Sequence, residues 1–379
     1  MTNPSEHSQE RRNIAVIGAG IVGVSCALYL QQAGFNVTMF DRDEPGSGAT
    51  YGNACTFALY GSIPVNRPDL IWRFPSLMFG QERPLSIAWR YMPKMIPWLM
   101  QFLKHCRQEH VDRTINGLGS LLRDAEDASM ILFRASGGND LISRDGTIYI
   151  YPNGFTILDP KQITSRMVDH LCHTGGRFIK GEVSAVEAQT ADGVAFKVNG
   201  SRHHYDQAVL AGGAWSMQIA KGGCEELPLD TERGYHVQFS ESAELLNRPV
   251  GFADAGFYMT PMYQGLRAAG TVELGGLNAA PNPERLSYIE RRVRQALPGA
   301  GPVSDTWLGF RPTLPDSLPV IGRSRHNPNL IFAFGHHHLG LTLGGITGKL
   351  VSEIAAGAIL DRTDSVDDGD RFPDRTPAV

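Results

Sequence analysis

Residues 13–41, which read NIAVIGAGIVGVSCALYLQQAGFNVTMFD, decide the fold. The run NIAVIG is typical of a short buried strand, and residues 21–32 have the periodicity of a helix that ends at Gly34. Residues 35–41 form a second apolar run of strand type. Strand, helix and strand in this order predict a β-α-β unit with parallel strands.

Three glycines at the first strand-to-helix junction predict a dinucleotide site. Gly18, Gly20 and Gly23 form the pattern G-x-G-x-x-G. In that pattern the first glycine permits a tight turn, the second lets the backbone approach a pyrophosphate, and the third lets the helix pack closely on the strand. Asp41 ends the second strand, where its carboxylate can accept a hydrogen bond from a ribose hydroxyl. Since the same charge repels a 2'-phosphate, NADP is disfavoured.

Two further glycine-rich segments favour FAD over NAD. Residues 46–54 read GSGATYGNA, where an NAD domain would continue with alternating helices and strands. Such a loop offers backbone N–H groups to a second flat or anionic part of a cofactor. Residues 335–345 read GHHHLGLTLGG and precede a helix predicted over residues 346–360. A helix N-terminus there could stabilise negative charge at flavin N1 and O2, which explains glycine at positions 340, 344 and 345.

The rest of the chain predicts two interleaved domains. Apolar runs at residues 208–216 and 330–334 return to the nucleotide-binding sheet, whereas residues 234–277 alternate in the manner of an antiparallel sheet. The predicted fold class is α/β plus α+β, a Rossmann-like FAD-binding domain interleaved with an antiparallel-sheet substrate domain. The FAD-binding domain is placed at residues 1–60, 155–228 and 305–379, and the substrate or cap domain at residues 61–154 and 229–304.

Composition excludes several classes of function. With 42% hydrophobic residues, 20% charged residues and a net charge of -4, the chain is globular and has no basic field for nucleic acid. Its five cysteines are far apart and form no C-x-x-C pair, which argues against disulfides and metal clusters and favours a cytoplasmic location. The adjacent residues His336, His337 and His338 rarely converge on one ion, so no metal is predicted. The sequence leaves the oligomeric state open.

The most apolar long stretch, Leu85 to Leu103, is too interrupted to span a membrane. Arg90, Lys94 and two prolines break it. Two alternatives stay open. The stretch could lie on a membrane surface as a peripheral contact at the inner face of the plasma membrane, or it could form amphipathic helices that close over a substrate cavity.

Five segments occur in the order found in a known family. They are GATYGNA (48–54), ERGYH (232–236), FYMTPM (257–262), WLGFRPTLPDSLPVIG (307–322) and GHHHLGLTLGG (335–345). With the glycine fingerprint, they resemble the D-amino-acid dehydrogenase small-subunit family, which belongs to the FAD-dependent glycine, sarcosine and D-amino-acid oxidases. The resemblance covers residues 13–360. The family usually carries glycine at the position of Cys55 and a longer stretch near Asn153.

The resemblance implies oxidative deamination of a D-amino acid or a cyclic imino acid of the proline or hydroxyproline type. Hydride would pass from the substrate Cα to flavin N5, and the electrons would go on to a quinone or another acceptor. Arg311 matches the family's carboxylate-binding position, where a guanidinium can bind bidentately; the alternative is an ion pair with Asp316. Tyr258 and Tyr235 could bind the same carboxylate or be sheet residues. His236 could assist amine deprotonation or be structural.

The residues expected to contact FAD belong to the glycine-rich segments and to nearby strand ends. They are Gly18, Ala19, Gly20, Ile21, Val22, Gly23, Asp41, Arg42, Gly48, Ala49, Thr50, Asn53, Ala54, Val183, Ala211, Gly212, Gly213, Trp215, Gly309, Arg311, His337, Leu339, Gly340, Leu341 and Thr342. Cys55 could attach the flavin covalently, although a small buried thiol is the simpler interpretation. Two other functions stay open: an oxidase that reduces oxygen, and a non-catalytic flavoprotein subunit.

Overall fold

The computed structural model describes residues 11–70, 72, 76, 84–144, 155–187, 192–252 and 255–358. Residues 1–10 and the surroundings of Asn153 lie outside the described residues. Within the described part, two sheets of different type build the molecule, and helices cover each of them.

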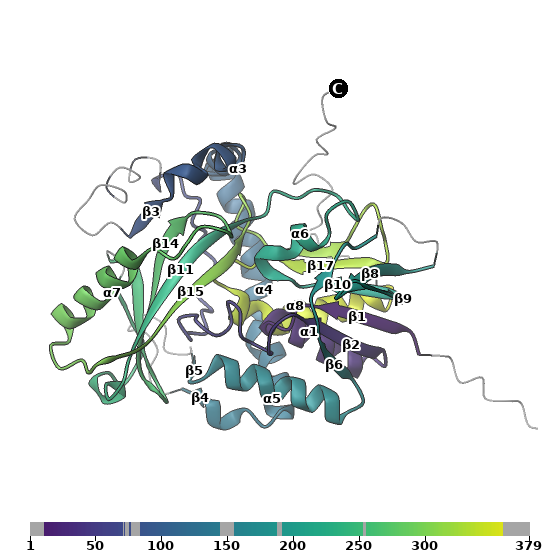
Figure 1. The fold of residues 1–379 in the computed structure, drawn as a ribbon, viewed down its shortest axis with the longest axis horizontal. Helices are drawn as coiled ribbons and strands as arrows, with labels where there is room; N and C mark the ends of the chain where they lie inside the picture. The colour runs from purple at the N-terminus through teal and green to yellow at the C-terminus, as the bar shows by residue number, and fades with distance from the viewer. Residues whose placement is uncertain are drawn as a thin grey trace, which may run out of the picture.

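The first sheet is mostly parallel and has the strand order β16-β17-β10-β1-β2-β6. All neighbours in it run parallel except β16, which pairs antiparallel with β17 at one edge. The chain leaves this sheet after β2, after β6 and after β10, and it returns at β6, at β10 and at β16 (Figure 1). The strands are β1 (Asn13–Ile17), β2 (Asn36–Asp41), β6 (Arg177–Lys180), β10 (Gln207–Leu210), β16 (Val320–Arg323) and β17 (Leu330–Phe334).

The two faces of the parallel sheet have different cover. On β1, Ile14 and Val16 point toward the helices, whereas Ala15 and Ile17 point toward a small three-stranded sheet, as the two-residue period of a strand requires. The helices are α1 (Ile21–Gln32), α4 (Gln108–Ala135), α5 (Pro160–His173) and α8 (Gly340–Ala355). The small sheet consists of β7 (Val183–Ser184), β8 (Val194–Val198) and β9 (Ser201–Tyr205).

Helix α8 begins at Gly340, six residues before the predicted start. The prediction assigned Gly344 and Gly345 to the cofactor, but both lie inside the helix and serve packing. A Cβ atom at Gly345 would lie 2.5 Å from the Ser129 nitrogen of α4, and one at Gly344 would lie 3.4 Å from the Ile21 oxygen of α1. Close approach of three helices therefore explains these glycines.

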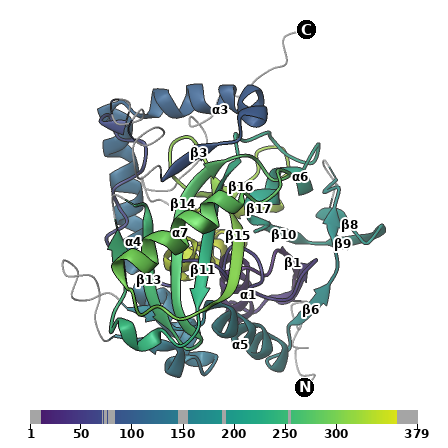
Figure 2. The same ribbon diagram turned by 60° about the vertical axis from the view of Figure 1, so that its left-hand side comes forward.

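The second sheet is antiparallel, in the order β12-β13-β14-β11-β15, and β3 runs parallel beside β14. Its strands are β3 (Leu85–Ile87), β11 (Asp230–Phe239), β12 (Val250–Phe252), β13 (Phe257–Met262), β14 (Gly265–Leu274) and β15 (Val303–Thr313). Helix α7 (Pro283–Ala296) covers its outer face through Tyr288, Ile289 and Val293 (Figure 2). The inner face turns toward the parallel-sheet domain (Figure 1).

Strand register decides which side chains reach that inner face. Residues on one strand alternate between faces, and directly paired residues on neighbouring strands share a face. Arg233 and Tyr235 lie on the outer face, where Tyr235 joins the apolar core beneath α7. The inner face carries three directly paired sets, Glu232 with Arg311, Gly234 with Gly309, and His236 with Trp307.

The structure places two segments differently from the predicted domain division. Strand β15 belongs to the antiparallel sheet as far as Thr313, beyond the predicted boundary at residue 305. Helix α4, predicted as part of the cap, packs on α1 and α8 of the FAD-binding domain through residues such as Leu118 and Leu122. Both differences arise because packing partners distant in sequence decide domain membership.

Helix α3 (Met92–His105) closes one end of the antiparallel sheet. Met95, Trp98 and Phe102 pack with Leu274 of β14. No helix in the described ranges is both long enough and apolar enough to span a bilayer. The remaining short elements are η1 (Trp89–Tyr91), η2 (Asn139–Leu141), β4 (Ile142–Ser143), β5 (Thr156–Ile157), η3 (Gly213–Trp215), α6 (Ser216–Ile219) and η4 (Ala243–Leu245).

Candidate active site

An elongated cavity of about 1060 Å³ lies between the two sheets. One end is lined by Arg42 and Trp215, beside the carboxyl ends of the parallel strands. The other end is lined by Tyr258 and Arg311 from the inner face of the antiparallel sheet. Of the residues predicted to contact the cofactor, all line this cavity except Gly23, Leu339 and Thr342.

The turn between β1 and α1 has the geometry that the glycine pattern predicts. Gly18 has a φ of 112°, and a Cβ atom there would lie 2.3 Å from the Ala211 oxygen. A Cβ atom at Gly23 would lie 1.9 Å from the Gly18 oxygen, so this glycine permits helix packing from behind the cavity. The Asp41 carboxylate accepts a hydrogen bond from the Ala19 N–H at 2.6 Å and lines the cavity beside the turn.

The end of the cavity that Arg42 and Trp215 line has a flat, cationic surface. The Arg42 guanidinium lies 4.3 Å from the centre of the Trp215 ring. Val183, Gly212 and Gly213 line the same region. An aromatic face with a stacked guanidinium suits a planar adenine ring next to a pyrophosphate.

The loop at residues 46–54 is held on both sides. On the FAD-domain side, Thr50 Oγ1 accepts a hydrogen bond from the Ile21 N–H at 3.0 Å. On the substrate-domain side, Thr260 Oγ1 donates to the Ala54 oxygen at 2.8 Å. Gly48, Ala49 and Asn53 line the cavity between these two attachments. The loop thus presents small residues to the cavity while both domains hold its backbone.

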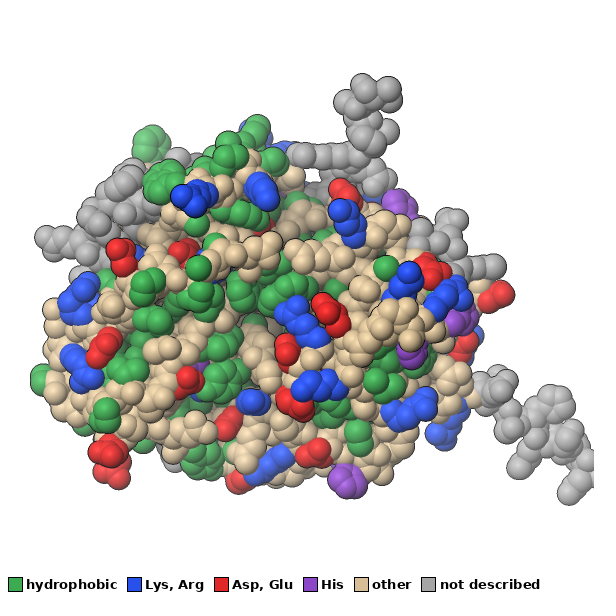
Figure 3. Space-filling model, in the orientation of Figure 1, with side chains coloured by type: hydrophobic (Ala, Val, Ile, Leu, Met, Phe, Trp, Pro, Cys, Tyr) green, Lys and Arg blue, Asp and Glu red, His purple; other side chains and the backbone are tan. Residues whose placement is uncertain are grey.

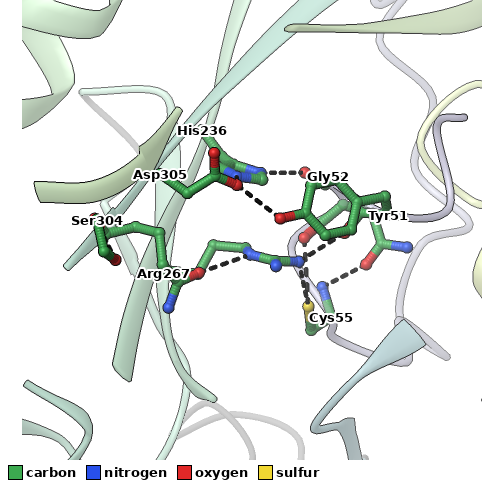
Figure 4. Close-up of polar contacts among 9 residues, drawn as sticks. Tyr51, Gly52, Cys55, His236, Arg267, Ser304 and Asp305 are labelled. Atoms are coloured by element: carbon green, nitrogen blue, oxygen red, sulfur yellow. Dashed lines mark hydrogen bonds and ion pairs between the residues drawn. The ribbon is translucent and has the colours of Figure 1, made fainter. Parts of the chain in front are cut away.

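A buried polar network behind the loop adds a third attachment (Figure 4). Arg267 Nη1 donates to the Tyr51 oxygen at 2.7 Å, and the Tyr51 hydroxyl donates to Asp305 Oδ2 at 2.6 Å. Burial and the nearby Asp305 carboxylate raise the pKa of Tyr51 to about 12, so this hydroxyl keeps its proton. The network fixes the loop against the inner face of the antiparallel sheet.

Cys55 lies in that network and does not line the cavity. Its φ of 63° is in the left-handed region, which explains why a glycine suits this position. Its sulfur lies 3.4 Å from Arg267 Nη1 (Figure 4), and burial raises the pKa of the thiol to about 11. A protonated thiol behind the loop supports the interpretation of a packing residue over covalent attachment of flavin.

The N-terminus of α8 faces the cavity from the opposite side. The helix has no side-chain cap, and Gly340 and Leu341 at its start line the cavity. Thr342 instead supports the neighbouring loop, because its Oγ1 accepts a hydrogen bond from the Ala58 N–H at 2.9 Å. Leu339 is buried in the helix core. The positive end of a helix dipole is therefore available to an anionic cofactor atom.

The three adjacent histidines point to different places. His336 Nε2 lies 2.8 Å from Thr347 Oγ1, and His337 Nε2 accepts a hydrogen bond from the Leu314 N–H at 3.1 Å. His338 is exposed to the cavity. Burial lowers the pKa of His336 and His337 to about 3, so both are neutral at physiological pH. Within the described ranges, no three His, Cys, Asp or Glu side chains gather as metal ligands.

Arg311 is oriented as a ligand for an anion. Its guanidinium lies over Gly234, where a Cβ atom would be 2.3 Å from Nη2. Nη1 donates to the Thr271 oxygen at 3.0 Å, its one hydrogen bond to the described protein. The predicted alternative, an ion pair with Asp316, is absent between these two described residues. Burial lowers the pKa of Arg311, while the charge of Glu232 opposes that shift.

Two of the predicted catalytic residues lie away from the cavity. The Tyr235 hydroxyl donates to Glu273 Oε2 at 2.5 Å on the outer face. His236 is on the inner face but stacks on Trp307 at 5.5 Å, deeper than the cavity wall. Burial lowers the pKa of His236 to about 4. Neither side chain is placed to bind a substrate or to take its proton, because strand alternation turns Tyr235 outward and the stacked indole covers His236.

Sequence reasoning did not identify three parts of the substrate end. Tyr60 lines the cavity, and its hydroxyl lies 3.5 Å from the Tyr258 hydroxyl. Glu232 lines it beside Arg311. Beyond them the wall is apolar and includes Trp98 and Leu99 of α3. The two-residue alternation of ERGYH could have indicated Glu232, but the contacts of Tyr60 and α3 depend on tertiary packing.

These features fit FAD. The glycine turn at the start of α1 fits a pyrophosphate, the Arg42–Trp215 surface fits an adenine, and the uncapped α8 end fits the electron-rich edge of a flavin. The cavity is continuous between them. Such an arrangement can hold a long two-part cofactor and leave its ring accessible from the Arg311 side.

Comparison with known proteins agrees with this geometry. The family model described as FAD dependent oxidoreductase matches residues 13–354. The chain is 30% identical to the D-amino-acid oxidase of Bradyrhizobium diazoefficiens, over 92% of this chain and 96% of that protein. It is 24% identical to the D-amino acid dehydrogenase of Helicobacter pylori, over 91% of this chain and 95% of that protein.

Solved structures have the same fold. Glycine oxidase from Geobacillus kaustophilus superposes with a TM-score of 0.64 at 18% identity, covering 93% of this chain and 96% of that one. L-Proline dehydrogenase from P. horikoshii gives a TM-score of 0.61 at 19% identity, covering 93% and 95%. The predicted fold class and the predicted FAD cofactor are confirmed. The chain belongs to the DAO family of FAD-dependent oxidoreductases.

Proposed function

We propose that this enzyme oxidises a D-amino acid or a cyclic D-imino acid of the proline or hydroxyproline type. The observation that carries the proposal is Arg311, whose guanidinium lines the cavity and has one hydrogen bond to the described protein. Flavin supplies a hydride acceptor at its N5 atom. The substrate Cα–H bond would break as a hydride leaves. The resulting imine hydrolyses to a 2-oxo acid and ammonia, or stays cyclic.

Arg311 would fix the substrate carboxylate. A guanidinium can offer a carboxylate two parallel N–H donors, which sets orientation as well as position. Orientation matters because the Cα hydrogen must point at the acceptor atom for transfer. Tyr258 and Tyr60, with hydroxyls 3.5 Å apart, would close the cavity around the substrate. The apolar wall at Trp98 and Leu99 would receive its side chain.

For the electrons, we propose that the acceptor is a quinone or a redox protein. A second candidate is an oxidase that reduces oxygen to hydrogen peroxide. The Bradyrhizobium relative, named an oxidase, favours that second candidate, whereas the Helicobacter relative, named a dehydrogenase, favours the first. The two candidates differ in the acceptor and share the substrate chemistry.

Anaerobic flavin bleaching tests the substrate class. The FAD-loaded protein is mixed without oxygen with D-amino acids, N-methyl amino acids and cyclic imino acids in turn, and flavin absorbance is followed. We expect bleaching with D-amino or D-imino acids and none with the L-enantiomers. No bleaching with any of these compounds would favour a non-catalytic flavoprotein. In air, peroxide equal to the substrate consumed would reject the dehydrogenase in favour of the oxidase.

We also propose that α3 rests on an anionic lipid surface, where a quinone would be available. Its outward side exposes Ile96 and Met100, which are 48% and 67% exposed. Figure 3 shows hydrophobic side chains interleaved with Lys and Arg at this end of the molecule. Residues 84–107 include four Lys or Arg and no Asp or Glu, although the whole chain has a net charge of -4. This pattern is typical of an interfacial helix.

Sedimentation with lipid vesicles tests the lipid contact. Vesicles of phosphatidylcholine alone are compared with vesicles that also contain phosphatidylglycerol. We expect binding to the anionic vesicles, and loss of binding in Lys94→Glu/Lys104→Glu. Arg291→Glu, a charge reversal on the exposed side of α7, should bind like the parent, whereas each of the single variants Lys94→Glu and Lys104→Glu should bind more weakly. Equal behaviour with both vesicle types would reject the contact.

A further inference from the structure

Glu232 is a buried carboxyl group without a partner among the described residues. It is 8% exposed and lines the cavity. Its backbone N–H donates to Thr313 Oγ1 at 3.2 Å, but no hydrogen bond or ion pair in the described part of the chain ends on its carboxyl oxygens. Burying such a group is costly unless something binds it. The usual explanation, a structural ion pair, does not apply to this residue.

Glu232 lies directly beside Arg311 in the antiparallel sheet. The two residues are directly paired across β11 and β15, so their side chains leave the same face of the sheet as neighbours. Arg311 bends away over Gly234 to donate to the Thr271 oxygen, and the two charged groups form no salt bridge. The cavity wall therefore carries a cation and an anion next to each other. Each of them can still form hydrogen bonds with a ligand.

The other described residues near Glu232 do not form a hydrogen bond or an ion pair with its carboxyl group. Leu274, its partner on β14, is apolar. Asp230, two residues earlier on the same strand, accepts hydrogen bonds from the Tyr91 hydroxyl at 3.0 and 3.1 Å. His338 lines the same cavity, and burial together with the charge of Arg311 lowers its pKa to about 4, so it is neutral. Within the described ranges, Arg311 is therefore the one charged group that acts on Glu232.

We propose that Glu232 binds the α-ammonium group of the substrate and takes its proton, so that Arg311 and Glu232 together recognise an amino-acid zwitterion. This assignment rests on the proposed function. The α-carboxylate and the α-ammonium of an amino acid are bonded to the same carbon, and the paired residues Arg311 and Glu232 offer each of them a group of opposite charge. The wall beyond them at Trp98 and Leu99 is apolar, which favours the α-ammonium over a cationic side chain.

The proton step precedes the redox step. One N–H bond of the ammonium breaks, an O–H bond forms on Glu232, and the nitrogen keeps the electron pair. The Cα–H bond would then break as the hydrogen leaves with both bonding electrons as a hydride for the flavin, and the nitrogen lone pair would form the C=N bond of an iminium product. Burial raises the pKa of Glu232, which makes its carboxylate a better proton acceptor than an exposed one.

The pH dependence of Glu232→Gln tests the assignment. We measure kcat/KM for the D-amino acid that bleaches the wild-type flavin fastest, from about pH 6 to about pH 10. Near neutral pH we expect a loss of about tenfold or more in Glu232→Gln, since the ammonium loses its ion pair and its base. The loss should shrink at high pH, where the free substrate amine is already neutral. Glu232→Asp should keep the wild-type shape of the profile with a raised KM.

Binding of a carboxylate without an amine separates recognition from folding. Benzoate binding is followed through the flavin spectrum. Glu232→Gln should bind benzoate as tightly as the wild type or more tightly, because a negative charge beside Arg311 is gone. Asp230→Asn, a matched change on the same strand outside the cavity, should leave the pH profile unchanged.

Three outcomes decide the matter. A Glu232→Gln profile parallel to the wild type rejects the assignment while the proposed function stands. Equal weakening of benzoate and of the amino acid in Glu232→Gln indicates a structural role and also rejects it. A wild-type flavin that no amino acid bleaches rejects the proposed function and the assignment together.

Discussion

Two Arg and Glu pairs share strand β11, where Glu232 and Arg233 are consecutive residues, and they differ in what surrounds them. On the outer face, Arg233 Nη1 lies 3.2 Å from Glu273 Oε2, and Arg233 Nη2 donates to the Ala279 and Ala280 oxygens at 2.9 Å. The Tyr235 hydroxyl also donates to Glu273. On the inner face, Glu232 and its paired arginine form no salt bridge with each other.

Both pairs are charged and buried, so neither property distinguishes a structural pair from a binding site. The distinction is whether the charged groups already have hydrogen-bond and ion-pair partners in the protein. Both pairs are buried in the same sheet, and sequence distance does not distinguish them. Arg233 and Glu273 form an ion pair, and each also has a hydrogen-bond partner elsewhere in the protein, so they can stabilise the fold and offer a ligand little. Arg311 and Glu232 retain bonding capacity, which a zwitterionic substrate would use. Four predictions test whether the two pairs differ in this way and how the residues around them contribute.

The largest expected effect is on stability at the outer pair. Glu273→Gln removes the charge that Arg233 needs and should lower the free energy of unfolding by about 3–5 kcal/mol, since it leaves a buried guanidinium without its counter-ion. Chemical denaturation of the FAD-loaded protein measures this. Glu232→Gln, the matched inner-face variant, should change it by less than about 1 kcal/mol. Similar losses in both variants would remove the contrast.

The next effect is on catalysis at the inner pair. Arg311→Leu should lower kcat/KM by about a thousandfold, because the substrate carboxylate loses two charge-assisted hydrogen bonds. FAD content, measured after gel filtration, should stay near that of the wild type. Arg311→Lys keeps the charge without the planar fork and should fall between the two. Unchanged kinetics in Arg311→Leu would remove this residue from its assigned role.

A third effect concerns how protein stability depends on pH through His236, which lies behind the residue 46–54 loop. The pKa of His236 is lowered from 6.5 to about 4 in the folded protein, so the unfolded chain takes up this proton first. The stability that neutral His236 contributes is fully present above about pH 6.5 and is lost as pH falls toward 4, by about 1.4 kcal/mol per pH unit. Between pH 6.5 and 5, the loss should be about 2 kcal/mol smaller in His236→Gln. Parallel stability curves would contradict this prediction.

The smallest effect concerns Cys55. Its φ of 63° strains any residue with a Cβ atom. Cys55→Gly relieves that strain, whereas Cys55→Ala keeps it and loses the sulfur contact with Arg267. We expect the glycine variant to be more stable than the alanine variant by about 1 kcal/mol in thermal unfolding, with FAD released by acid from both. Flavin that stays attached to the wild type after acid precipitation would show a covalent bond instead.

The cofactor half of the site could be predicted because its geometry is local. A strand, a glycine turn and a helix follow one another within residues 13–41, so the conformation of Gly18 and the place of Asp41 follow from neighbours in sequence. The glycines at positions 344 and 345 were harder, because a glycine that permits helix packing and one that faces a cofactor look alike in a sequence.

The substrate half depends on register between strands far apart in the chain. Glu232 and Arg311 are paired across 79 residues, and α3 reaches the cavity through contacts with distant strands, such as its packing on Leu274 and the hydrogen bond from the Trp98 indole to the Thr313 oxygen. Strand alternation alone would have turned Tyr235 outward, since it is one residue from Gly234 on the cavity face. Nothing in the local sequence of Tyr60 indicates that its hydroxyl meets that of Tyr258.

The most direct test of the account is a crystal structure of the FAD-loaded protein with benzoate bound. We predict the adenine beside Arg42 and Trp215, the flavin ring between the residue 46–54 loop and the start of α8, and the benzoate carboxylate on Arg311. A flavin ring at the Arg42 end, or a benzoate carboxylate held away from Arg311, would contradict the account.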